Sequence, residues 1–563
     1  MKAIHKLGIG ALALATLASS CTKDFENINK NPEITPDISP EMLITTSQKA
    51  MVDRDFDWFY EHYQYLMRYT QFTVSYPDGN TGGMFANPRV NDFYSAFYTN
   101  IGRNLTDIQQ IVDGKTGSDQ AYYAQVRAIA TVNKVYSAFR VTDVNGSIPY
   151  TEAFLARVGE GSFKPAYDSQ EKLFDIFDAE LKAAITTLTT AGQFMQVGKY
   201  DIFYAGDASK WAKAANVLRL KIAMRLGKRA PQKLQAIATE VMASPAGLFT
   251  GVADEWKFIS STNFARGGNW NAQGNATRGG KTLVDFMYDN SDPRLNLFFK
   301  KNGFTLAVFN RLKAGGAFPA SAVYNPRQYV GMPESPDDRN NPAFARLYGV
   351  KRYSIVEGGQ NVSVEVDTLS TFQNRIFDLG SDGDLAGAYT QPMVTYAEMC
   401  FILSELSLKS IITGDATEWY NKGVTASINA YSGIATLAPA VDFTVATPEA
   451  IYAYLAKPAI AFTGTTDEKM EKIGIQQYIN SFKTPWEAWG YYKLLGYPKV
   501  GGILNRKEFI ASGVKQEIPR RWPLPISNQN IDNYNKAVTE MKATGEYGNA
   551  VEDITGRVWW DKK

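Results

Sequence analysis

The stretch SDQAYYAQVRAIATVNKVYSAFRVT, from Ser118 to Thr142, indicates the fold class. Tyr122, Val126 and Ile129 recur at helical spacing and so share one face of a helix. Similar patterns fill most of the chain before residue 245 and return after residue 394. The ranges predicted to be helical are 41–72, 91–113, 118–142, 168–190, 207–228, 231–243, 394–412, 415–432, 467–482 and 485–495. We therefore expect a mainly α protein.

Short turns between these helices predict antiparallel helix pairs that stack side by side. No strict 34-residue period repeats, so the expected fold is a degenerate, tetratricopeptide-like array of helix pairs. Residues 246–392 differ, because they are rich in Gly, Asn and Pro and contain short strand-like pieces such as NVSVEV. Long irregular loops on a helical scaffold often carry function, so we expect a ligand here.

The N-terminus has the order of a secretory signal. Lys2 and Lys6 precede the apolar run 7–18, which is too short to span a bilayer, and two small residues precede Cys21. We predict a lipoprotein signal peptide at 1–20, a lipidated N-terminal tether at 21–40 and one substrate-binding domain at 41–563. The tether is polar and contains prolines, and no linker divides the remainder.

The composition of the expected mature chain excludes several classes of function. Loss of Lys2 and Lys6 lowers the Lys and Arg count from 59 to 57, equal to the 57 Asp and Glu, which argues against nucleic-acid binding. Loss of His5 leaves His62 as the one histidine, and Cys21 and Cys400 are the only cysteines. A His/Cys zinc site cannot be built from these residues. We expect no catalysis and no cofactor.

A metal site is weakly supported in DLGSDGD, residues 378–384. Asp378 and Asp382 match the first and fifth positions of a calcium loop, but Gly380 and Tyr389 break the ligand pattern at the third and twelfth. We expect a solvated acidic turn and no bound metal.

The stretch NFARGGNWNAQGNATRGGK, from Asn263 to Lys281, is the main candidate for ligand contact. Glycine allows close backbone approach, Asn and Arg supply directional hydrogen bonds, and Trp270 supplies a flat apolar face. These properties suit a sugar ring and would suit a peptide almost as well. The aromatic residues of the exposed loop SYPDGNTGG and of the first helix are further candidates. The ligand-binding candidates are Trp270, Asn263, Arg266, Asn269, Asn271, Tyr76 and Trp58.

Several segments in a fixed order resemble the SusD/RagB outer-membrane lipoproteins, especially the SusD-like starch-utilisation group. The segments are DFENINKNP, TDVNGSIPYTEAF, PAYDSQEKLFDIFDAELKAAITTL, GDASKWAKAANVLRLKIAMRL, SDPRL, AEMCFILSELSLKSIITGDATEWYNKGVTASINAY and RRWPLPISNQNIDNYNKA. Their order and spacing extend over nearly the whole expected mature chain. One departure is Ala18, which stands where leucine is commonest in a lipoprotein signal, but small residues are tolerated there.

The resemblance implies a SusD-like α-α superhelix on the outer face of the outer membrane of a Gram-negative bacterium. The expected partner is a SusC-like TonB-dependent transporter, over which such proteins act as a lid, and the expected ligand is an oligosaccharide or, in some members, a peptide. The resemblance implies acyl chains on Cys21, and Lys23-Asp24 is similar to the signal for surface export. Two alternatives of other classes remain open, a carboxylate-based glycoside hydrolase and a scaffold that binds only protein.

Overall fold

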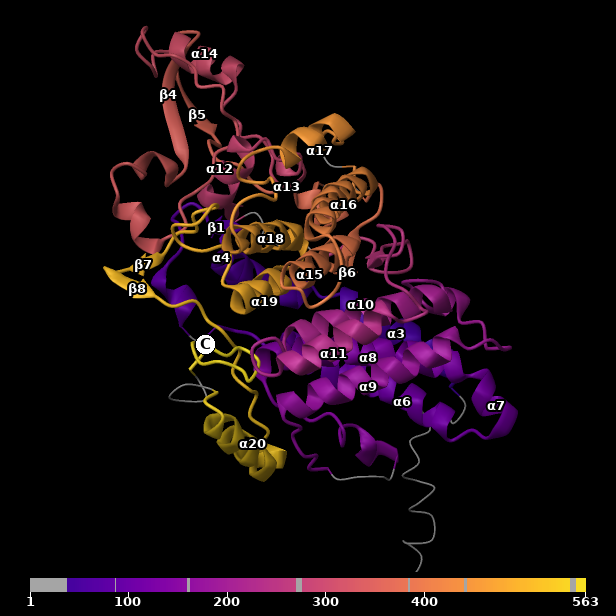
Figure 1. The fold of residues 1–563 in the computed structure, drawn as a ribbon. Helices are drawn as coiled ribbons and strands as arrows, with labels where there is room; N and C mark the ends of the chain where they lie inside the picture. Colours follow the sequence, from indigo (N-terminus) through magenta and orange to yellow (C-terminus); the bar gives the residue numbers. More distant parts are fainter. Residues whose placement is uncertain are drawn as a thin grey trace, which may run out of the picture.

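The structure is a computed structural model that describes residues 38–86, 88–158, 163–269, 276–382, 385–439, 443–546 and 553–563. It is mainly helical, as predicted, with helices from the two halves of the chain stacked against one another (Figure 1). The predicted signal peptide and Cys21 lie outside the described residues. Within the described residues, no helix is both long and apolar enough to cross a membrane.

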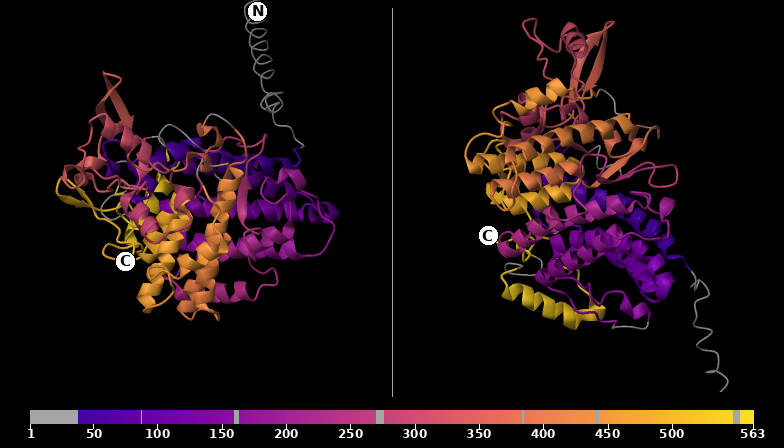
Figure 2. Two further views of the ribbon diagram at one scale, coloured as in Figure 1. Left: turned by 90° about the horizontal axis from the view of Figure 1, so that it is seen from above. Right: turned by 45° about the vertical axis from the view of Figure 1, so that its right-hand side comes forward.

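The N-terminal half forms a block of packed helices, coloured indigo to magenta in Figure 2. Neighbouring helices along the chain pack against each other, α8 on α9, α9 on α10 and α10 on α11, as the short turns predict. The helices are α3 (Pro40–Val52), α5 (Asp92–Ala96), α6 (Gly102–Asp113), α7 (Gly117–Tyr122), α8 (Ala124–Asn145), α9 (Gln170–Thr189), α10 (Ala208–Met224) and α11 (Pro231–Met242), with the π-helix η3 (Phe97–Ile101) between α5 and α6.

The prediction of one continuous helix at 41–72 is wrong, because the structure divides this range into three helical segments. The structure has α3, then the π-helix η1 (Asp57–Leu66), then the short α4 (Met67–Tyr69). The side chain of Arg54 folds onto Asp57 with an N–O distance of 2.5 Å, and its backbone N–H donates to the Asn269 side chain at 2.7 Å. A distant loop therefore takes the hydrogen bond that a continuous helix would use. π-helical segments are rare and occur often at functional sites.

The C-terminal half supplies a second block, orange to yellow in Figure 2. Its helices confirm the predicted ranges after residue 394 and add two that the sequence pattern missed, α17 and α20. The block contains α15 (Tyr396–Leu408), α16 (Ala416–Leu437), α17 (Pro448–Leu455), α18 (Thr466–Asn480) and α19 (Pro485–Leu495). α20 (Ile531–Ala543) lies apart from it, and its buried residues join the core of the N-terminal helices (Figure 1). Three helices of the middle region were also missed, α12 (Lys281–Asp289), α13 (Leu295–Phe298) and α14 (Leu306–Ala314).

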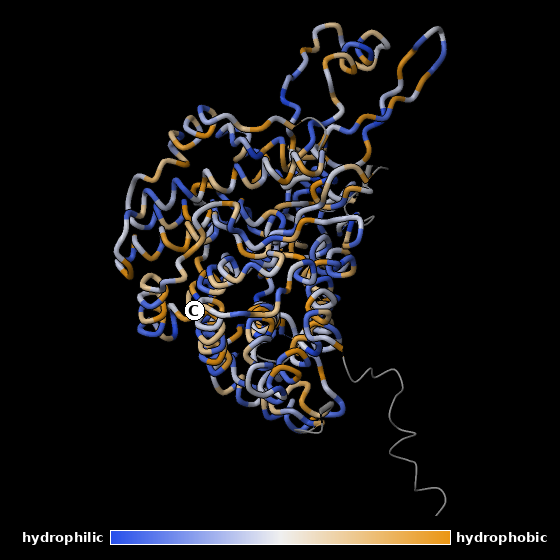
Figure 3. The backbone as a smooth tube through the Cα atoms, turned by 90° about the vertical axis from the view of Figure 1, so that its right-hand side faces the viewer, coloured by the Kyte–Doolittle hydropathy of each residue, from blue (hydrophilic) through white to orange (hydrophobic). Residues whose placement is uncertain are grey.

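The described residues form four antiparallel sheets of two strands each. The pairs are β1 (Thr73–Ser75) with β3 (Thr277–Gly279), β2 (Trp256–Ile259) with β6 (Thr390–Val394), β4 (Lys351–Glu357) with β5 (Gln360–Val366), and β7 (Phe509–Ala511) with β8 (Val514–Gln516). β5 confirms the strand expected in NVSVEV. The β4–β5 hairpin and α14 project from the body as an arm whose chain mixes apolar and polar residues (Figures 1 and 3).

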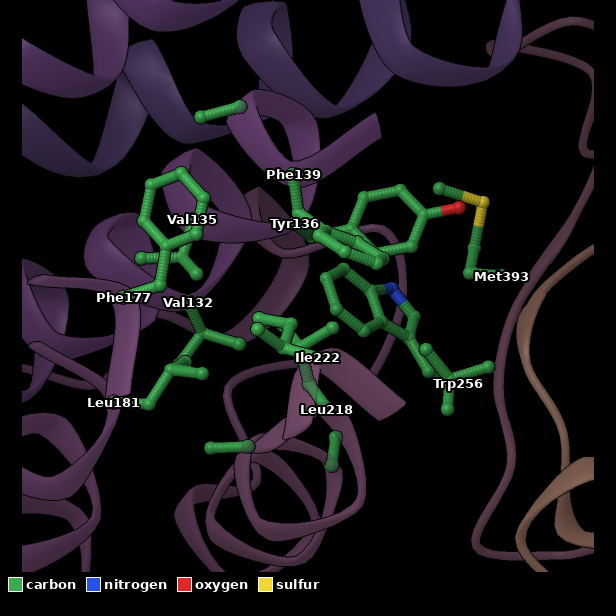
Figure 4. Packing of buried hydrophobic residues seen from close by; sticks show 14 of the residues in the cluster. Val132, Val135, Tyr136, Phe139, Phe177, Leu181, Leu218, Ile222, Trp256 and Met393 are labelled. Carbon is green, nitrogen blue, oxygen red and sulfur yellow. The ribbon is translucent and has the colours of Figure 1, made fainter. Parts of the chain in front are cut away.

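Aromatic rings fill the core where the helix block meets the β2–β6 sheet (Figure 4). Trp256 of β2 lies 4.8 Å from Tyr136 of α8 and 4.9 Å from Trp211 of α10, measured between ring centroids. All three rings are buried, so they remove a large apolar area from water. This packing fixes the sheet on the helices.

Buried charges join the two helix blocks. The Lys221 ammonium of α10 lies 2.9 Å from a carboxylate oxygen of Glu398 in α15 and 2.7 Å from one of Glu487 in α19. Burial acts to lower the pKa of Lys221, but the two carboxylates outweigh it and raise that pKa above its usual value. The ammonium therefore stays charged, and its removal would leave buried carboxylates without a counter-ion.

We expect Lys221→Met to lower the free energy of unfolding by about 3 to 5 kcal/mol, the typical cost of breaking a buried ion pair. Chemical denaturation measures this. The control is Lys182→Met, which removes the exposed pair with Glu240 and should change stability by less than about 1 kcal/mol. Equal effects of the two substitutions would contradict the role given to Lys221.

Candidate functional site

The Gly- and Asn-rich stretch 263–281 is attached to the body at two anchors, Asn269 and the strand β3. Asn269 is 1% exposed, and its side chain forms hydrogen bonds with the connection between α3 and η1. Its Nδ2 donates to the carbonyl of Val52 at 2.7 Å and to the Tyr389 hydroxyl at 3.1 Å, while its Oδ1 accepts from the N–H of Arg54 at 2.7 Å. The amide of Asn269 is thus fully used within the protein, and it positions the loop.

Glycine is required next to this anchor. Gly268 has φ +107°, and a Cβ there would lie 2.4 Å from the carbonyl oxygen of Phe377. The close approach lets the Asn269 N–H donate to that carbonyl at 3.0 Å, and the Leu379 N–H donates to the carbonyl of Gly267 at 2.6 Å. The loop base is therefore held to residues 377–379 by its backbone.

The second end of the stretch is anchored by β3, which pairs with β1. The pairing places Tyr76 directly beside the loop, and its N–H donates to the carbonyl of Ala276 at 2.8 Å. The guanidinium of Arg278 lies 3.6 Å from the centroid of the Tyr76 ring and 2.9 Å from a carboxylate oxygen of Asp367. The cation covers one face of the ring and orients it.

Two further aromatic rings lie with Tyr76. Tyr348 approaches the turn after Tyr76 so closely that a Cβ on Gly79 would lie 2.7 Å from its ring, and the Gly349 N–H donates to the carbonyl of Pro77 at 3.0 Å. Phe344, Tyr348 and Tyr76 are all partly buried around Met332. Half-buried rings on a fixed backbone suit stacking on an apolar ring face.

The other candidates fall around the first anchor. Trp58 is 2% exposed, and its ring centroid lies 5.3 Å from that of Phe377. Trp58 therefore packs against a residue that holds the loop base. Asn263 and Arg266 are exposed beside that base. Trp270 and Asn271 lie outside the described residues, in the segment between the two anchors. The structure thus brings Tyr76 to one anchor, and Asn269, Trp58, Asn263 and Arg266 to the other.

Sequence reasoning missed Arg278, Phe344 and Tyr348. Arg278 belongs to the quoted stretch, and its position directly before a double glycine was the available signal. Tyr348 lies about 270 residues from Tyr76, and no local pattern indicates that the two meet. Their proximity depends on tertiary packing.

The histidine and the cysteine that the structure describes, His62 and Cys400, are both buried. His62 is buried, 4.7 Å from Trp58 and 4.9 Å from Trp486, and burial lowers its pKa well below the usual value. Burial likewise raises the pKa of the Cys400 thiol to about 12. Neither side chain is an accessible nucleophile or base. In the described parts of the chain, no group of three or more His, Cys, Asp or Glu is arranged to hold a metal ion.

The chain is similar to a known protein family and to solved structures. A SusD-like family model, described as "Starch-binding associating with outer membrane", matches residues 30–313 and 339–525. No curated protein matches the chain.

Among solved structures, a chitin-binding protein is 24% identical, with a TM-score of 0.68 over 93% of this chain and 100% of that one. A SusD homologue from Bacteroides fragilis is 20% identical, with a TM-score of 0.66 over 93% and 100%. A chitin-binding SusD homologue from Flavobacterium johnsoniae is 20% identical, with a TM-score of 0.62 over 93% and 98%. These likenesses confirm the helical, tetratricopeptide-like architecture.

We expect Asn269→Ala to lower the free energy of unfolding by about 2 to 3 kcal/mol, because it leaves the Arg54 N–H and the Val52 carbonyl without their buried partner. Amide hydrogen exchange should rise at residues 264–268 and 52–54. The control is Asn263→Ala, an exposed asparagine of the same stretch, which should change stability by less than about 0.5 kcal/mol. Unchanged exchange at 264–268 in Asn269→Ala would contradict the anchoring role.

Proposed function

This chain belongs to the SusD-like family, and we propose that it captures oligosaccharides at the cell surface for import through a SusC-like TonB-dependent transporter, over which it acts as a lid. The family associates with the outer membrane and consists of binding proteins rather than enzymes, which supports a glycan-binding role. The transporter partnership and the lid role are part of this proposal.

One observation carries the ligand proposal: the half-buried rings of Tyr76 and Tyr348 beside the Arg278 guanidinium. Sugar rings present apolar C–H faces that stack on aromatic rings and hydroxyls that need hydrogen-bonding partners. Trp270 would add a third aromatic face, because it lies in the short segment between the Asn269 and Ala276 anchors. Starch and chitin fragments are the first ligands to test, given the family description and the two chitin-binding structures.

Affinity electrophoresis on immobilised polysaccharides tests the ligand class, beside mass spectrometry of any peptides that co-purify with the native protein. Retardation by a glycan supports the proposal. Bound peptides with no retardation on any glycan would assign the same site to peptides. The release of new reducing ends from oligosaccharides, abolished by one Asp or Glu substitution, would show a hydrolase instead.

We expect Trp270→Ala to weaken oligosaccharide binding by about 1 to 3 kcal/mol, the usual cost of losing an aromatic anchor, without a change in the melting temperature. Tyr76→Ala should act in the same direction. Isothermal titration calorimetry measures both. Tyr452→Ala, a 78% exposed tyrosine on α17, is the matched control and should bind as the wild type does. Wild-type affinity in Trp270→Ala would remove Trp270 from the site.

The membrane attachment rests on Cys21 in our proposal, with residues 1–20 removed as a signal peptide, 21–40 as the tether and 41–563 as one binding domain. Several acyl chains on one cysteine make anchoring stable, whereas one chain alone binds marginally. Lys23 and Asp24 would then direct the protein to the outer face.

We expect Cys21→Ser to move the protein from the outer-membrane fraction to the soluble fraction, and to leave the melting temperature of the folded domain unchanged. The wild-type protein, purified from solubilised outer membranes, should co-elute with a large barrel protein. Membrane retention of Cys21→Ser would exclude the lipid anchor, and elution of the wild-type protein alone would contradict the transporter partnership.

A further inference from the structure

A groove of about 630 Å³ lies beside the candidate site, and none of the sequence-based candidates lines it. Its walls come from α12, from residues 333–344 and from residues 503–507. α12 directly follows β3, and the groove lining starts at Lys281, where the Gly- and Asn-rich stretch ends. The volume falls in the range of small-molecule sites.

Glu334 forms the base of this groove. It is 1% exposed, and its Oε1 accepts a hydrogen bond from the Thr282 N–H at the start of α12, at 2.6 Å. The backbone carbonyl of Glu334 accepts from the Asn80 side chain at 2.8 Å, which ties the groove to the turn that carries Tyr76. Burial raises the pKa of Glu334 to about 7, so near neutral pH its carboxyl occurs in forms that accept and that donate hydrogen bonds.

Lys507 lies at the opposite wall and is held by its backbone. The Gln71 side chain donates to the Lys507 carbonyl at 2.6 Å and accepts from its N–H at 3.1 Å. Lys507 is exposed, and among the described residues its ammonium has no hydrogen-bond or ion-pair partner, although it attracts the Asp338 carboxylate of the same groove electrostatically. A fixed backbone with an available ammonium offers three donors to a ligand in the groove.

The remaining lining favours a ligand without strong charge. Lys281 and Arg327 both pair with Asp285, and Arg327 also lies 3.7 Å from Asp289, so these acids are compensated within the protein. Phe344 contributes a half-buried ring to the wall. An apolar ring face combined with separate donors and acceptors matches a hydroxyl-rich ring better than a phosphate or a polyanion.

The structure has another hollow of similar size, about 660 Å³, among α6, α7, α8 and α9. No aromatic side chain lines it, and six of its fifteen lining residues are alanine. Two of its charged residues, Arg127 and Asp113, pair with each other at 2.7 Å. It lacks a stacking surface, so the α12 groove is the stronger site for a sugar.

We propose that the α12 groove is a second glycan subsite, in which Glu334 and Lys507 bind hydroxyls and Phe344 stacks on a ring. The proposal rests on the proposed function and extends it, because the groove and the Tyr76 site serve one ligand. Ala276 beside Tyr76 and Lys281 in the groove are five residues apart, so their Cα atoms are separated by no more than about 18 Å. An oligosaccharide of several rings can span that distance, whereas one or two rings reach a single subsite.

The test is calorimetric titration of the full chain with maltose and maltoheptaose, and with chitobiose and chitohexaose. Wild-type affinity should rise with ligand length for the series that binds. Phe344→Ala, Glu334→Gln and Lys507→Ala should each lose roughly tenfold in affinity for the long oligosaccharide, the loss typical of one interface anchor, and much less for the disaccharide. Glu334→Gln is nearly isosteric, so it keeps an acceptor for Thr282.

Tyr452→Ala and Lys515→Ala are the controls for the aromatic and the lysine substitution, because both residues are exposed on other elements. They should retain wild-type affinity. Wild-type affinity in all three groove variants, with affinity lost in Tyr76→Ala, would overturn the second subsite and leave the proposed function standing. Failure of the wild-type protein to bind either series would overturn both.

Discussion

The buried amide of Asn269 is the constraint on which the ligand face depends. Its hydrogen bonds to the backbone of Val52 and Arg54 fasten an irregular stretch to the first helices of the chain. These hydrogen bonds lie at the break between α3 and η1, so the helix break provides the backbone groups that hold the loop. β3 holds the later part of the stretch beside Tyr76, so both anchors are fixed to the body of the protein.

The helix blocks supply the rigid support for this face. Lys221 of α10, placed between carboxylates of α15 and α19, joins the two blocks through a buried charge cluster, and the ring cluster around Trp256 fixes the β2–β6 sheet on the same helices. Residues 377–379 and Tyr389 hold the loop base, and Tyr389 directly precedes β6, which leads into α15. The loops of the proposed site are therefore tied to the core, which keeps their side chains in position without secondary structure of their own.

Helical periodicity predicted most of the scaffold, because long helices such as α9 carry buried residues at helical spacing, among them Leu173, Phe177 and Leu181. It missed α12 and α14, whose nine residues each are too short for a periodic pattern to stand out. It also missed α20, although Tyr534, Val538 and Met541 show the helical spacing. The division of the first helix was not predictable, since at the break the Arg54 N–H donates its hydrogen bond to a residue more than 200 positions away.

The site was predictable only as a region. Composition identified the stretch 263–281, but it could not separate Asn269, which holds the protein together, from asparagines that face outward. The groove residues Glu334, Phe344 and Lys507 come from distant segments and become a set only through packing. Burial and hydrogen-bond partners, rather than residue type, distinguish residues that position the site from residues available to a ligand.

Hydrogen–deuterium exchange with and without a bound oligosaccharide tests the central claim most directly. The account predicts protection on binding in residues 263–282 and 332–348, the anchored stretch and the segment that carries Phe344 and Tyr348. Protection confined to the helices α6 to α9, or to the β4–β5 arm, would contradict it.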